Sequence, residues 1–436
     1  MRQFFHSVTL DSEKCKGCIN CMKRCPTEAI RVRNGKAFII TERCIDCGEC
    51  IRVCPHHAKL PIYDSLTILK QFRYTIALPA PAFYGQFHNL DDIDILLGAL
   101  KKLGFDEVFE VSAAAELVSD ATRKMMAELP RPVISSACPA VTRLIRVRFP
   151  HLIDKVLPLN APVEIAARMG KRAAMKKTGL KEEEIGVIFI SPCPAKVTAS
   201  KMPLGTEHSY IDGVLAISDV YVHVLPLMKE VAAGPHEALS TSGKIGISWG
   251  TSGGEAAGML SDNYLAADGV LNVIKVLEDL EDDKINDVDF IELNACSGGC
   301  VGGVLTAENP YVAKARLGKL RKYLPVSCNH LEGSIPHLAQ FDTPLEFAPV
   351  LKLDDNLMQA FEKMSDMERI AASLPGLDCG SCGAPSCQAL AEDVVRGLAS
   401  VEDCIFQLKE HMQSQKLDEY IPAPFRTGSE EKGEGD

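Results

Sequence analysis

Two cysteines near the middle of the chain have the spacing of a metal site. Cys296 and Cys300 form a C-x-x-x-C pair that encloses two glycines, and an apolar run from Val288 onward predicts a strand that ends at the pair. Thiolates are the usual ligands of iron–sulfur clusters, and glycine lets the backbone approach a bulky inorganic ligand. The pair needs two more thiolates, for which the candidates are Cys138 and Cys193.

The first 60 residues contain an internal repeat of four cysteines followed by a proline. The runs are Cys15-x-x-Cys18-x-x-Cys21-x-x-x-Cys25-Pro26 and Cys44-x-x-Cys47-x-x-Cys50-x-x-x-Cys54-Pro55. In bacterial ferredoxins with two 4Fe–4S clusters, the fourth cysteine of each run ligates the other cluster. We therefore expect cluster one on Cys15, Cys18, Cys21 and Cys54, and cluster two on Cys44, Cys47, Cys50 and Cys25. Zinc, the alternative for a single C-x-x-C pair, is disfavoured by two complete runs.

A third group of cysteines lies near the C-terminus and has a helical pattern between its last two members. The group consists of Cys379, Cys382, Cys387 and Cys404. It predicts one more 4Fe–4S cluster in a small helical module, although four thiolates also suit zinc. Cys328 matches none of these motifs, and we expect it to be an ordinary buried thiol.

The charge, hydrophobicity and cysteine content of the chain disfavour several classes of protein. The 436 residues carry a formal net charge of −11, which gives no electrostatic support for binding nucleic acid. No apolar run is long enough to span a membrane, and the first 15 residues lack the pattern of a signal peptide. Many of the 17 cysteines stand in C-x-x-C pairs, which favours metal ligation over disulfides. We therefore expect a cytoplasmic protein in a reducing, anaerobic setting.

Strands and helices alternate between residues 74 and 305, which predicts an α/β fold. Strands are expected over Tyr74–Leu78, Glu107–Val111, Pro132–Ser136, Glu184–Ile190 and Lys244–Ser248, and helices over Asp91–Gly104, Ala113–Leu129, Ala161–Met175 and Asn356–Ala372. Each cysteine of the central group follows the end of a strand, where ligand sites of open α/β sheets gather. A hairpin with an Asn34-Gly35 turn is expected between the two ferredoxin-type runs, and the acidic stretch 278–289 is expected to be a solvated loop.

Four segments together resemble the active-site domain of FeFe-hydrogenases. They are SSACPA (135–140), SPCPAK (191–196), NACSGGC (294–300) and the glycine-rich loop 250–254. The resemblance implies an H-cluster, which is a 4Fe–4S cubane bridged by a cysteine sulfur to a diiron unit with carbonyl, cyanide and azadithiolate ligands. It implies that the cubane is held by Cys138, Cys193, Cys296 and Cys300, with Cys300 as the bridge.

The same resemblance implies roles for residues around the diiron unit. Lys196, three residues after a ligand, would donate to an iron-bound cyanide, an anionic acceptor that needs a fixed cation. Ala80, Pro81 and Ala82 would line the other side of the unit. Gly298 and Gly299 would leave room for the cluster.

The chain departs from catalytic members of that family at its proton-relay positions. The free cysteine that usually donates a proton is Ala137, and the acidic residue expected after the lysine is Ala199. Two methionines that usually precede the second and third loops are replaced, at Ser191 and Asn294. Since general acid–base help is worth ~10²–10⁴ in rate, we expect a hydrogenase-type oxidoreductase of low activity.

The chain resembles sensory FeFe-hydrogenases in three features: an altered first loop, a CVGG segment after the third loop, and a C-terminal module that opens with LPGxDCGSCG. It resembles the branch of that group that has no PAS domain. We therefore expect a hydrogen sensor that slowly interconverts hydrogen with protons and electrons and relays its redox state through accessory 4Fe–4S clusters to a redox or signalling partner. Hydrogenase maturation proteins are implied as further partners, and a homodimer is a candidate assembly. The alternatives are a slow catalytic hydrogenase, or an iron–sulfur electron-transfer or assembly protein without the diiron unit.

These observations divide the chain into four parts. A two-cluster ferredoxin domain is expected over residues 1–62, and a two-lobed α/β H-cluster domain over 63–365. A small helical 4Fe–4S module follows over 366–412. The polar tail 413–436 is expected to be disordered.

Overall fold

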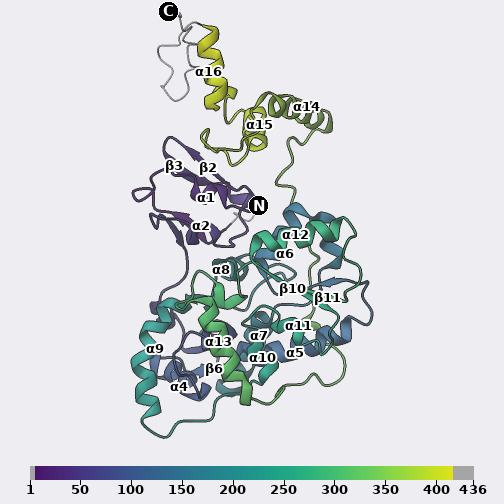
Figure 1. Ribbon diagram of the computed structural model, residues 1–436. Helices are drawn as coiled ribbons and strands as arrows, with labels where there is room; N and C mark the ends of the chain where they lie inside the picture. The colour runs from purple at the N-terminus through teal and green to yellow at the C-terminus, as the bar shows by residue number, and fades with distance from the viewer. Residues whose placement is uncertain (1–4, 416–436) are drawn as a thin grey trace, which may run out of the picture.

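The computed structural model describes residues 5–415, which form three parts stacked along the long axis of the molecule (Figure 1). The N-terminal part lies between a large α/β part and a small group of C-terminal helices. It therefore contacts both of the other parts, as the hydrogen bonds described below show.

The two cysteine runs of the N-terminal part fold alike. Cys21 lies in α1 (Asn20–Lys23), and Cys50 lies in α2 (Glu49–Arg52). The strands are β1 (Val8–Leu10), β2 (Ile30–Arg33), β3 (Lys36–Ile39) and β4 (Lys59–Pro61); β1 pairs with β4 and β2 with β3, both antiparallel. Asn34 and Gly35 have φ angles of 50° and 71°, as a type I′ turn requires. The predicted hairpin is therefore confirmed.

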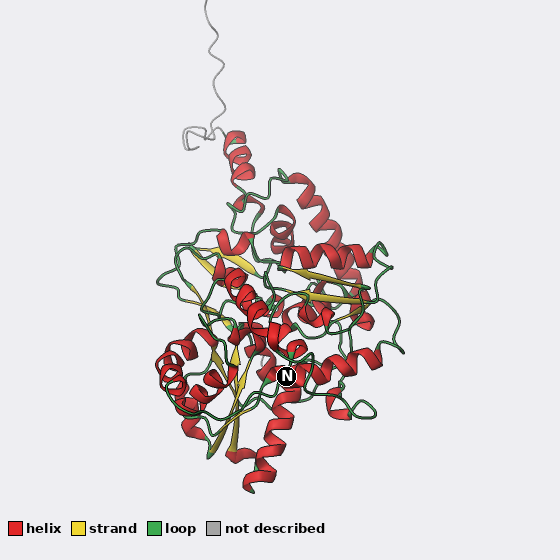
Figure 2. Ribbon diagram, turned by 60° about the horizontal axis from the view of Figure 1, so that its bottom comes forward, coloured by secondary structure: helices red, strands yellow, loops and turns green. Residues whose placement is uncertain are grey.

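The central part contains two parallel sheets in separate lobes, each with helices beside it (Figure 2). The first sheet has the order β6-β5-β8-β9, and the second has the order β10-β11-β7. The strands are β5 (Tyr74–Pro79), β6 (Glu107–Val108), β7 (Val133–Ile134), β8 (Ile185–Ser191), β9 (Gly213–Ala216), β10 (Tyr264–Asp268) and β11 (Phe290–Asn294). The predicted two-lobed α/β architecture is therefore confirmed.

Helices cover both faces of the first sheet. The helices of the central part are α3 (Pro81–Tyr84), α4 (Ile93–Leu103), α5 (Val111–Met125), α6 (Pro139–Arg148), α7 (Pro162–Thr178), α8 (Pro194–Lys201), α9 (Ile217–Ala232), α10 (Lys244–Ser248), α11 (Gly254–Ala257), α12 (Val270–Glu281) and α13 (Pro310–Leu320). Val187 and Phe189 of β8 pack in one core with α5 and α7, whereas Ile188 and Ile190 pack in another with α4 and α9. Successive side chains of a strand point to opposite faces, so a strand buried on both sides is apolar throughout.

Three sequence predictions for this part are wrong in detail. Lys244–Ser248 is the helix α10 and not a strand, because a segment of five residues is too short to distinguish the two periodicities. The strand predicted over Glu107–Val111 ends at Val108, since α5 begins at Val111. The first residues of the acidic stretch 278–289 complete α12, which ends at Glu281.

The C-terminal part consists of α14 (Leu357–Ser373), α15 (Cys387–Val395) and α16 (Ile405–Ser414). Because α16 extends to Ser414, the first residues of the predicted tail 413–436 are helical, and the rest of that prediction lies outside the described residues. No helix within residues 5–415 is long and apolar enough to cross a membrane.

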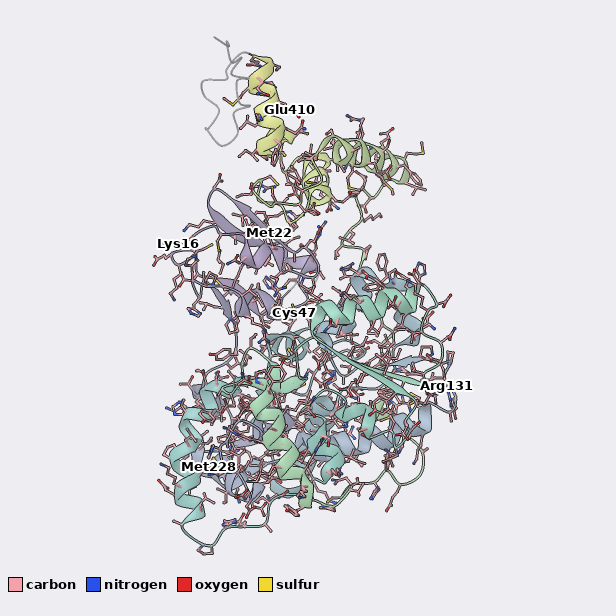
Figure 3. All side chains as sticks on the ribbon, in the orientation of Figure 1. Lys16, Met22, Cys47, Arg131, Met228 and Glu410 are labelled. Carbon is pink, nitrogen blue, oxygen red and sulfur yellow. The ribbon has the colours of Figure 1, made fainter. Side chains whose placement is uncertain are left out.

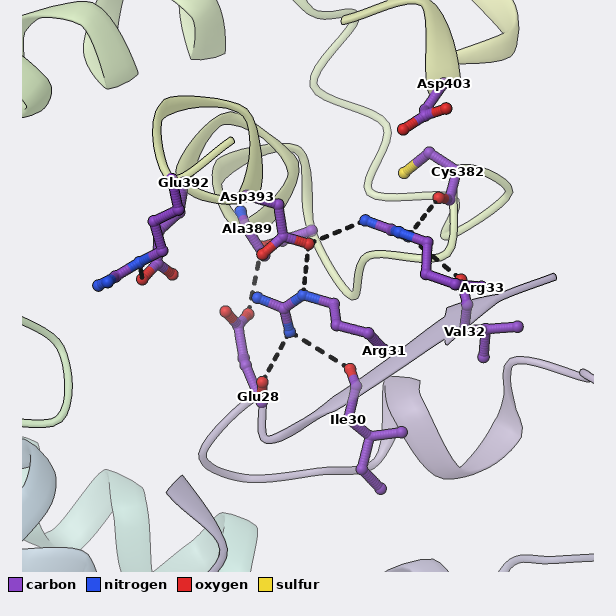
Figure 4. Close-up of polar contacts among 12 residues, drawn as sticks. Glu28, Ile30, Arg31, Val32, Arg33, Cys382, Ala389, Glu392, Asp393 and Asp403 are labelled. Atoms are coloured by element: carbon purple, nitrogen blue, oxygen red, sulfur yellow. Dashed lines mark hydrogen bonds and ion pairs between the residues drawn. The ribbon is translucent and has the colours of Figure 1, made fainter. Parts of the chain in front are cut away.

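Buried ion pairs attach the C-terminal part to the N-terminal part (Figure 4). Asp393 of α15 accepts from Arg31 Nε at 2.7 Å and from Arg33 Nη2 at 2.9 Å, and the Arg31 side chain is 1% exposed. Glu392 pairs with Arg43. The backbone N–H of Val32 also donates to the carbonyl of Gly383 at 2.9 Å, so the contact includes the backbone of β2.

Candidate active site and iron–sulfur ligands

Three loops at the carboxyl ends of parallel strands bring four thiols together between the two lobes. Cys138 follows β7 and caps α6, and Cys193 follows β8 and caps α8. Cys296 and Cys300 follow β11. Proline occupies the first position of both capped helices, where its fixed φ suits a helix start and its missing N–H costs nothing.

The four thiols lie close together, and Cys193 is buried while the other three are half-buried. Burial raises the pKa of Cys296, and the nearby thiols of Cys193, Cys138 and Cys300 raise it further. Bound iron would stabilise these thiols as thiolates by displacing their protons. This donor set therefore fits a 4Fe–4S cubane.

Lys196 of α8 places a buried ammonium beside the four thiols. Its Nζ donates to the Sγ of Cys300 at 3.7 Å. Burial lowers the pKa of Lys196, but the neighbouring thiols of Cys300, Cys193, Cys138 and Cys296 outweigh burial, so the net shift is upward. The structure thus provides a fixed cation on the same side as Cys300.

A cavity opens beside these thiols. Ala80, Pro81, Ala137, Lys196 and Cys300 belong to its wall. Two of the residues expected to line the diiron unit, Ala80 and Pro81, thus face the cavity. Ala82, the third, instead packs in the apolar core with Phe83 and Phe87.

Gly299 supports the loop that carries Cys296 and Cys300. Its φ is +89°, and a Cβ there would lie 2.3 Å from the backbone nitrogen of Ser252 in the glycine-rich loop. Any side chain would therefore push the two loops apart. Gly298 also has a positive φ of +83°, but a Cβ there would meet only ordinary contacts.

Two buried carboxylates in the cavity wall were missed by sequence reasoning. Glu255 accepts from Ser135 Oγ at 2.8 and 2.7 Å through its two oxygens. Glu292 accepts from the backbone N–H groups of Gly253 and Ala256 and from Asn294 Nδ2. Burial, and next the charge of Glu292, raise the pKa of Glu255 to about 8. One sequence signal existed, because Glu292 is a charged residue inside an otherwise apolar strand.

The ferredoxin-type cysteines fall into two groups in space. Burial raises the pKa of Cys47 and of Cys50, and the thiol of Cys25 raises both further. Cys54 acts in the same way on Cys21. Each fourth cysteine thus lies with the first three of the other run, which is the crossed grouping expected from the repeat.

The second ferredoxin-type run lies against the central site. Burial and the thiols of Cys25 and Cys50 raise the pKa of Cys47. The thiol of Cys296 is close enough to raise the pKa of Cys47 as well, by a smaller amount. Arg52 Nη2 donates to the carbonyl of Gly302 at 2.6 Å. The loop that carries Cys296 and Cys300 therefore contacts the N-terminal part directly.

The first run lies against the C-terminal cysteines. Lys23 Nζ donates to the carbonyl of Asp378 at 2.6 Å, and Arg33 Nη1 donates to the carbonyl of Cys382 at 2.7 Å. Cys404 is buried, Cys382 and Cys387 are half-buried, and Cys379 is exposed. Cys328, predicted to be buried, is exposed. Its backbone N–H donates to the buried Glu116, which fixes the loop with the thiol outside the core.

Family models match each of the three parts. The domain described as "Iron only hydrogenase large subunit, C-terminal domain" matches residues 73–261 and 250–304. A "4Fe-4S dicluster domain" matches 7–55, and a "Putative Fe-S cluster" region matches 374–406. The last match favours iron over zinc at the C-terminal cysteines.

Individual relatives are distant. Iron hydrogenase 1 of Clostridium pasteurianum is 24% identical over 369 residues, which cover 68% of this chain and 64% of that protein. A probable cytosolic Fe-S cluster assembly factor of Caenorhabditis elegans is 24% identical over 258 residues, which cover 48% of this chain and 56% of that protein. The chain thus spans less than two thirds of the length of either relative.

Among solved structures, an FeFe-hydrogenase variant from Chlamydomonas reinhardtii aligns with a TM-score of 0.49 and 16% identity, covering 64% of this chain and 95% of that one. The family assignment depends instead on the domain match, which spans more than half of the 436 residues. With its ferredoxin-type and C-terminal iron–sulfur regions, the chain belongs to the family of iron-only hydrogenase large subunits.

Proposed function

We propose that this chain is a hydrogen sensor that binds hydrogen at an H-cluster and turns it over slowly. When bound, the H-cluster supplies the chemistry that interconverts hydrogen with protons and electrons. Its cubane ligands would be Cys138, Cys193, Cys296 and Cys300, with Cys300 as the bridge to the diiron unit. The observation that carries the proposal is Ala137 in the cavity wall, because its methyl group has no proton to donate.

The chain's own residues would hold and orient the diiron unit. The Lys196 ammonium lies beside Cys300 and would donate to an anionic cyanide ligand. Ala80 and Pro81 give the cavity an apolar wall on another side. Gly298 and Gly299 would leave room for the cluster, and Gly299 lets the loop of Cys300 pack closely on the glycine-rich loop.

Glu255 and Glu292 would exchange protons with the cavity in place of the missing thiol. A carboxyl group whose pKa is raised to about 8 is protonated at neutral pH and can both donate and accept a proton near that pH. This observation favours a second candidate function, a slow but genuine catalytic hydrogenase with an unusual proton path.

The remaining proposals concern the rest of the molecule. Domain boundaries would fall as expected, at 1–62, 63–365, 366–412 and 413–436. The accessory groups would be two ferredoxin-type clusters and one C-terminal 4Fe–4S cluster on Cys379, Cys382, Cys387 and Cys404. We place the protein in the cytoplasm, with hydrogenase maturation proteins, an unidentified redox or signalling protein and a second copy of the chain as candidate partners.

The similarity to a probable Fe–S cluster assembly factor favours a third candidate, a protein that holds the cubane without a diiron unit. Infrared spectra of the anaerobically matured protein, first under argon and then under hydrogen, distinguish it from the others. We expect carbonyl and cyanide bands that shift when hydrogen is added. Absence of these bands, with full cubane iron and a successfully matured control, would leave the assembly or electron-transfer alternative.

Restoring the missing thiol separates the two hydrogen-dependent candidates. If Ala137 limits turnover, Ala137→Cys should raise the hydrogen oxidation rate by at least ~10²-fold, the usual worth of a positioned general acid or base. Ala140→Cys, at the buried second residue of α6, is the control and should not raise the rate. An unchanged rate in Ala137→Cys, with normal infrared bands, would favour a complete proton path through the carboxylates.

A further inference from the structure

Lys59 is a buried cation without a partner in the ferredoxin-like part. The residue is 1% exposed and ranks among the largest fully buried side chains. Its Nζ has no hydrogen-bond partner among residues 5–415, and no ion pair there includes it. An isolated buried ammonium is costly because it loses its hydration without gaining a counter-charge. The protein alone therefore does not account for the charge at this position.

The internal repeat shows that a cation is not required here for folding. Lys59 follows Cys54-Pro55 at the same spacing at which Ile30 follows Cys25-Pro26. Ile30 is likewise buried, at 2% exposure. The residues before them also correspond, because the N–H of Ala29 donates to Cys25 Sγ at 3.2 Å and that of Ala58 donates to Cys54 Sγ at 3.3 Å. The two copies therefore differ in charge at equivalent positions.

The Lys59 ammonium acts mainly on the cluster-one ligands. Burial raises the pKa of Cys21, and the charge of Lys59 is the largest influence that opposes it. Lys59 also lowers the pKa of Cys54, through both its backbone N–H and its charge. Lys59 also lowers the pKa of Cys50, a cluster-two ligand. An anionic cluster on these thiolates would supply the counter-charge that the protein does not.

We propose that Lys59 is a redox-tuning residue that raises the reduction potential of cluster one (Cys15, Cys18, Cys21 and Cys54) above that of an otherwise equal site with an apolar residue there. Reduction adds one electron, and thus one negative charge, to the cluster without making or breaking a bond. A fixed cation in a medium of low dielectric stabilises that added charge. Cluster two has the apolar Ile30 at the equivalent position and is influenced by Lys59 through Cys50. The proposal rests on the ligand assignment above but not on the chemistry of the central cavity.

Redox titration of the full, cluster-loaded chain with dithionite, followed by electron paramagnetic resonance, tests the proposal. In Lys59→Met and in Lys59→Ile, which copies the other half of the repeat, we expect the ratio of reduced to oxidised cluster one to fall ~10-fold at a fixed potential, which is about 59 mV for a one-electron couple. The potential of cluster two should fall less. Lys16→Met removes the same charge from an exposed position between two cluster-one ligands (Figure 3), where solvent screens it, and should shift neither cluster appreciably.

Three outcomes would overturn the proposal. Unchanged potentials in both Lys59 variants would show that the ammonium has no effect on the clusters. An equal shift in Lys16→Met would show that net charge, and not the buried position, matters. Loss of cluster-one iron from both Lys59 variants would make Lys59 a structural residue. Iron analysis and electron paramagnetic resonance of the unmodified chain test the ligand assignment separately. If the assignment were wrong, the wild type would lack two ferredoxin-type signals.

Discussion

At the scale of single residues, the wall of the central cavity combines the apolar Ala137 with two buried carboxylates. Ala137 and Glu255 line the same cavity, and Ser135, two residues before Ala137, donates to both oxygens of Glu255. The loop of Ala137 therefore holds the carboxyl group of Glu255, which comes from α11.

Glu255→Gln removes this proton while keeping the size of the side chain. We expect the rate of exchange between deuterium gas and water protons to fall by ~10²-fold or more if the carboxyl group carries the proton. Glu255→Asp should retain part of the rate, because it keeps an ionisable group. Glu278→Gln, an exposed substitution on α12, is the control. Equal rates in wild type and Glu255→Gln would exclude this carboxyl group from the proton path.

The raised pKa of Glu255 also predicts a pH dependence of stability. Its pKa is about 8 in the folded protein and 4.5 for an ordinary glutamate. The stabilising contribution of the protonated group is therefore fully present below pH 4.5 and is lost as the pH rises through about 8. We expect Glu255→Gln to be on the order of a few kcal/mol more stable relative to wild type above pH 8 than at pH 4.5. Thermal unfolding of both proteins across this range measures the difference, and parallel curves would contradict it.

At the scale of elements, the cysteine loops owe their convergence to parallel strands. β7, β8 and β11 each end where a ligand loop begins, and the two sheets direct these ends toward one place. The C-terminal module is positioned differently, by the helix α15, whose Asp393 pairs with Arg31 and Arg33 of β2. Its attachment therefore depends on a few buried charges.

Asp393→Ala should detach the C-terminal module. Breaking a buried ion pair from one side typically costs 3–5 kcal/mol, because the partner charge stays buried without compensation. We expect faster amide hydrogen exchange at Val32, whose N–H donates to Gly383 across the contact. Asp366→Ala in α14 removes an exposed ion pair with Arg369 and should leave that exchange rate unchanged. Protection of Val32 in Asp393→Ala equal to wild type would show that other contacts hold the module.

At the scale of the whole molecule, the cysteine groups follow one another from the central site to the C-terminal helices. The second ferredoxin-type run touches the loop of Cys296 and Cys300, and the first run touches the module that begins at Cys379 (Figure 1). The exposed Cys379 lies at the end of this series. The C-terminal module is thus the part from which a redox partner would be reached most directly.

The metal inventory of the molecule can be tested by removing one thiol at a time. Cys404→Ser should lower the iron content by one cluster, because Cys404 is a buried member of the C-terminal group. Cys328→Ser, at an exposed thiol outside every group, should leave it unchanged. Metal analysis of both variants measures the difference. A loss of zinc and not iron from Cys404→Ser would establish the zinc alternative.

Sequence reasoning predicted the features that depend on repeated motifs and on turn residues. The cysteine runs, the Asn34-Gly35 hairpin and the alternation of strands and helices each depend on local spacing, which folding leaves unchanged. α10 was missed because Lys244–Ser248 is too short to show a period, and its Gly246 fits closely against the Ser112 carbonyl from a distant helix.

The carboxylates were missed for a different reason. Glu255 and Glu292 are 37 residues apart, and they meet only because α11 packs against β11 beside the cysteine loops. Lys59 was overlooked because its significance appears only when its burial is compared with that of Ile30. Such features depend on which residues are close in the folded structure, and a single sequence does not show this directly.

The contact between Arg31 and Asp393 joins residues 362 positions apart, and it therefore also fixes an order of events during synthesis. A ribosome that adds ~5–20 residues per second completes the N-terminal part roughly 20–70 s before it delivers α15. Throughout that interval the guanidinium of Arg31 and the edge of β2 are open to water and to any assisting protein. The ferredoxin-like part is thus accessible to other proteins during synthesis of the rest of the chain. The C-terminal helices, which are made last, then cover this surface.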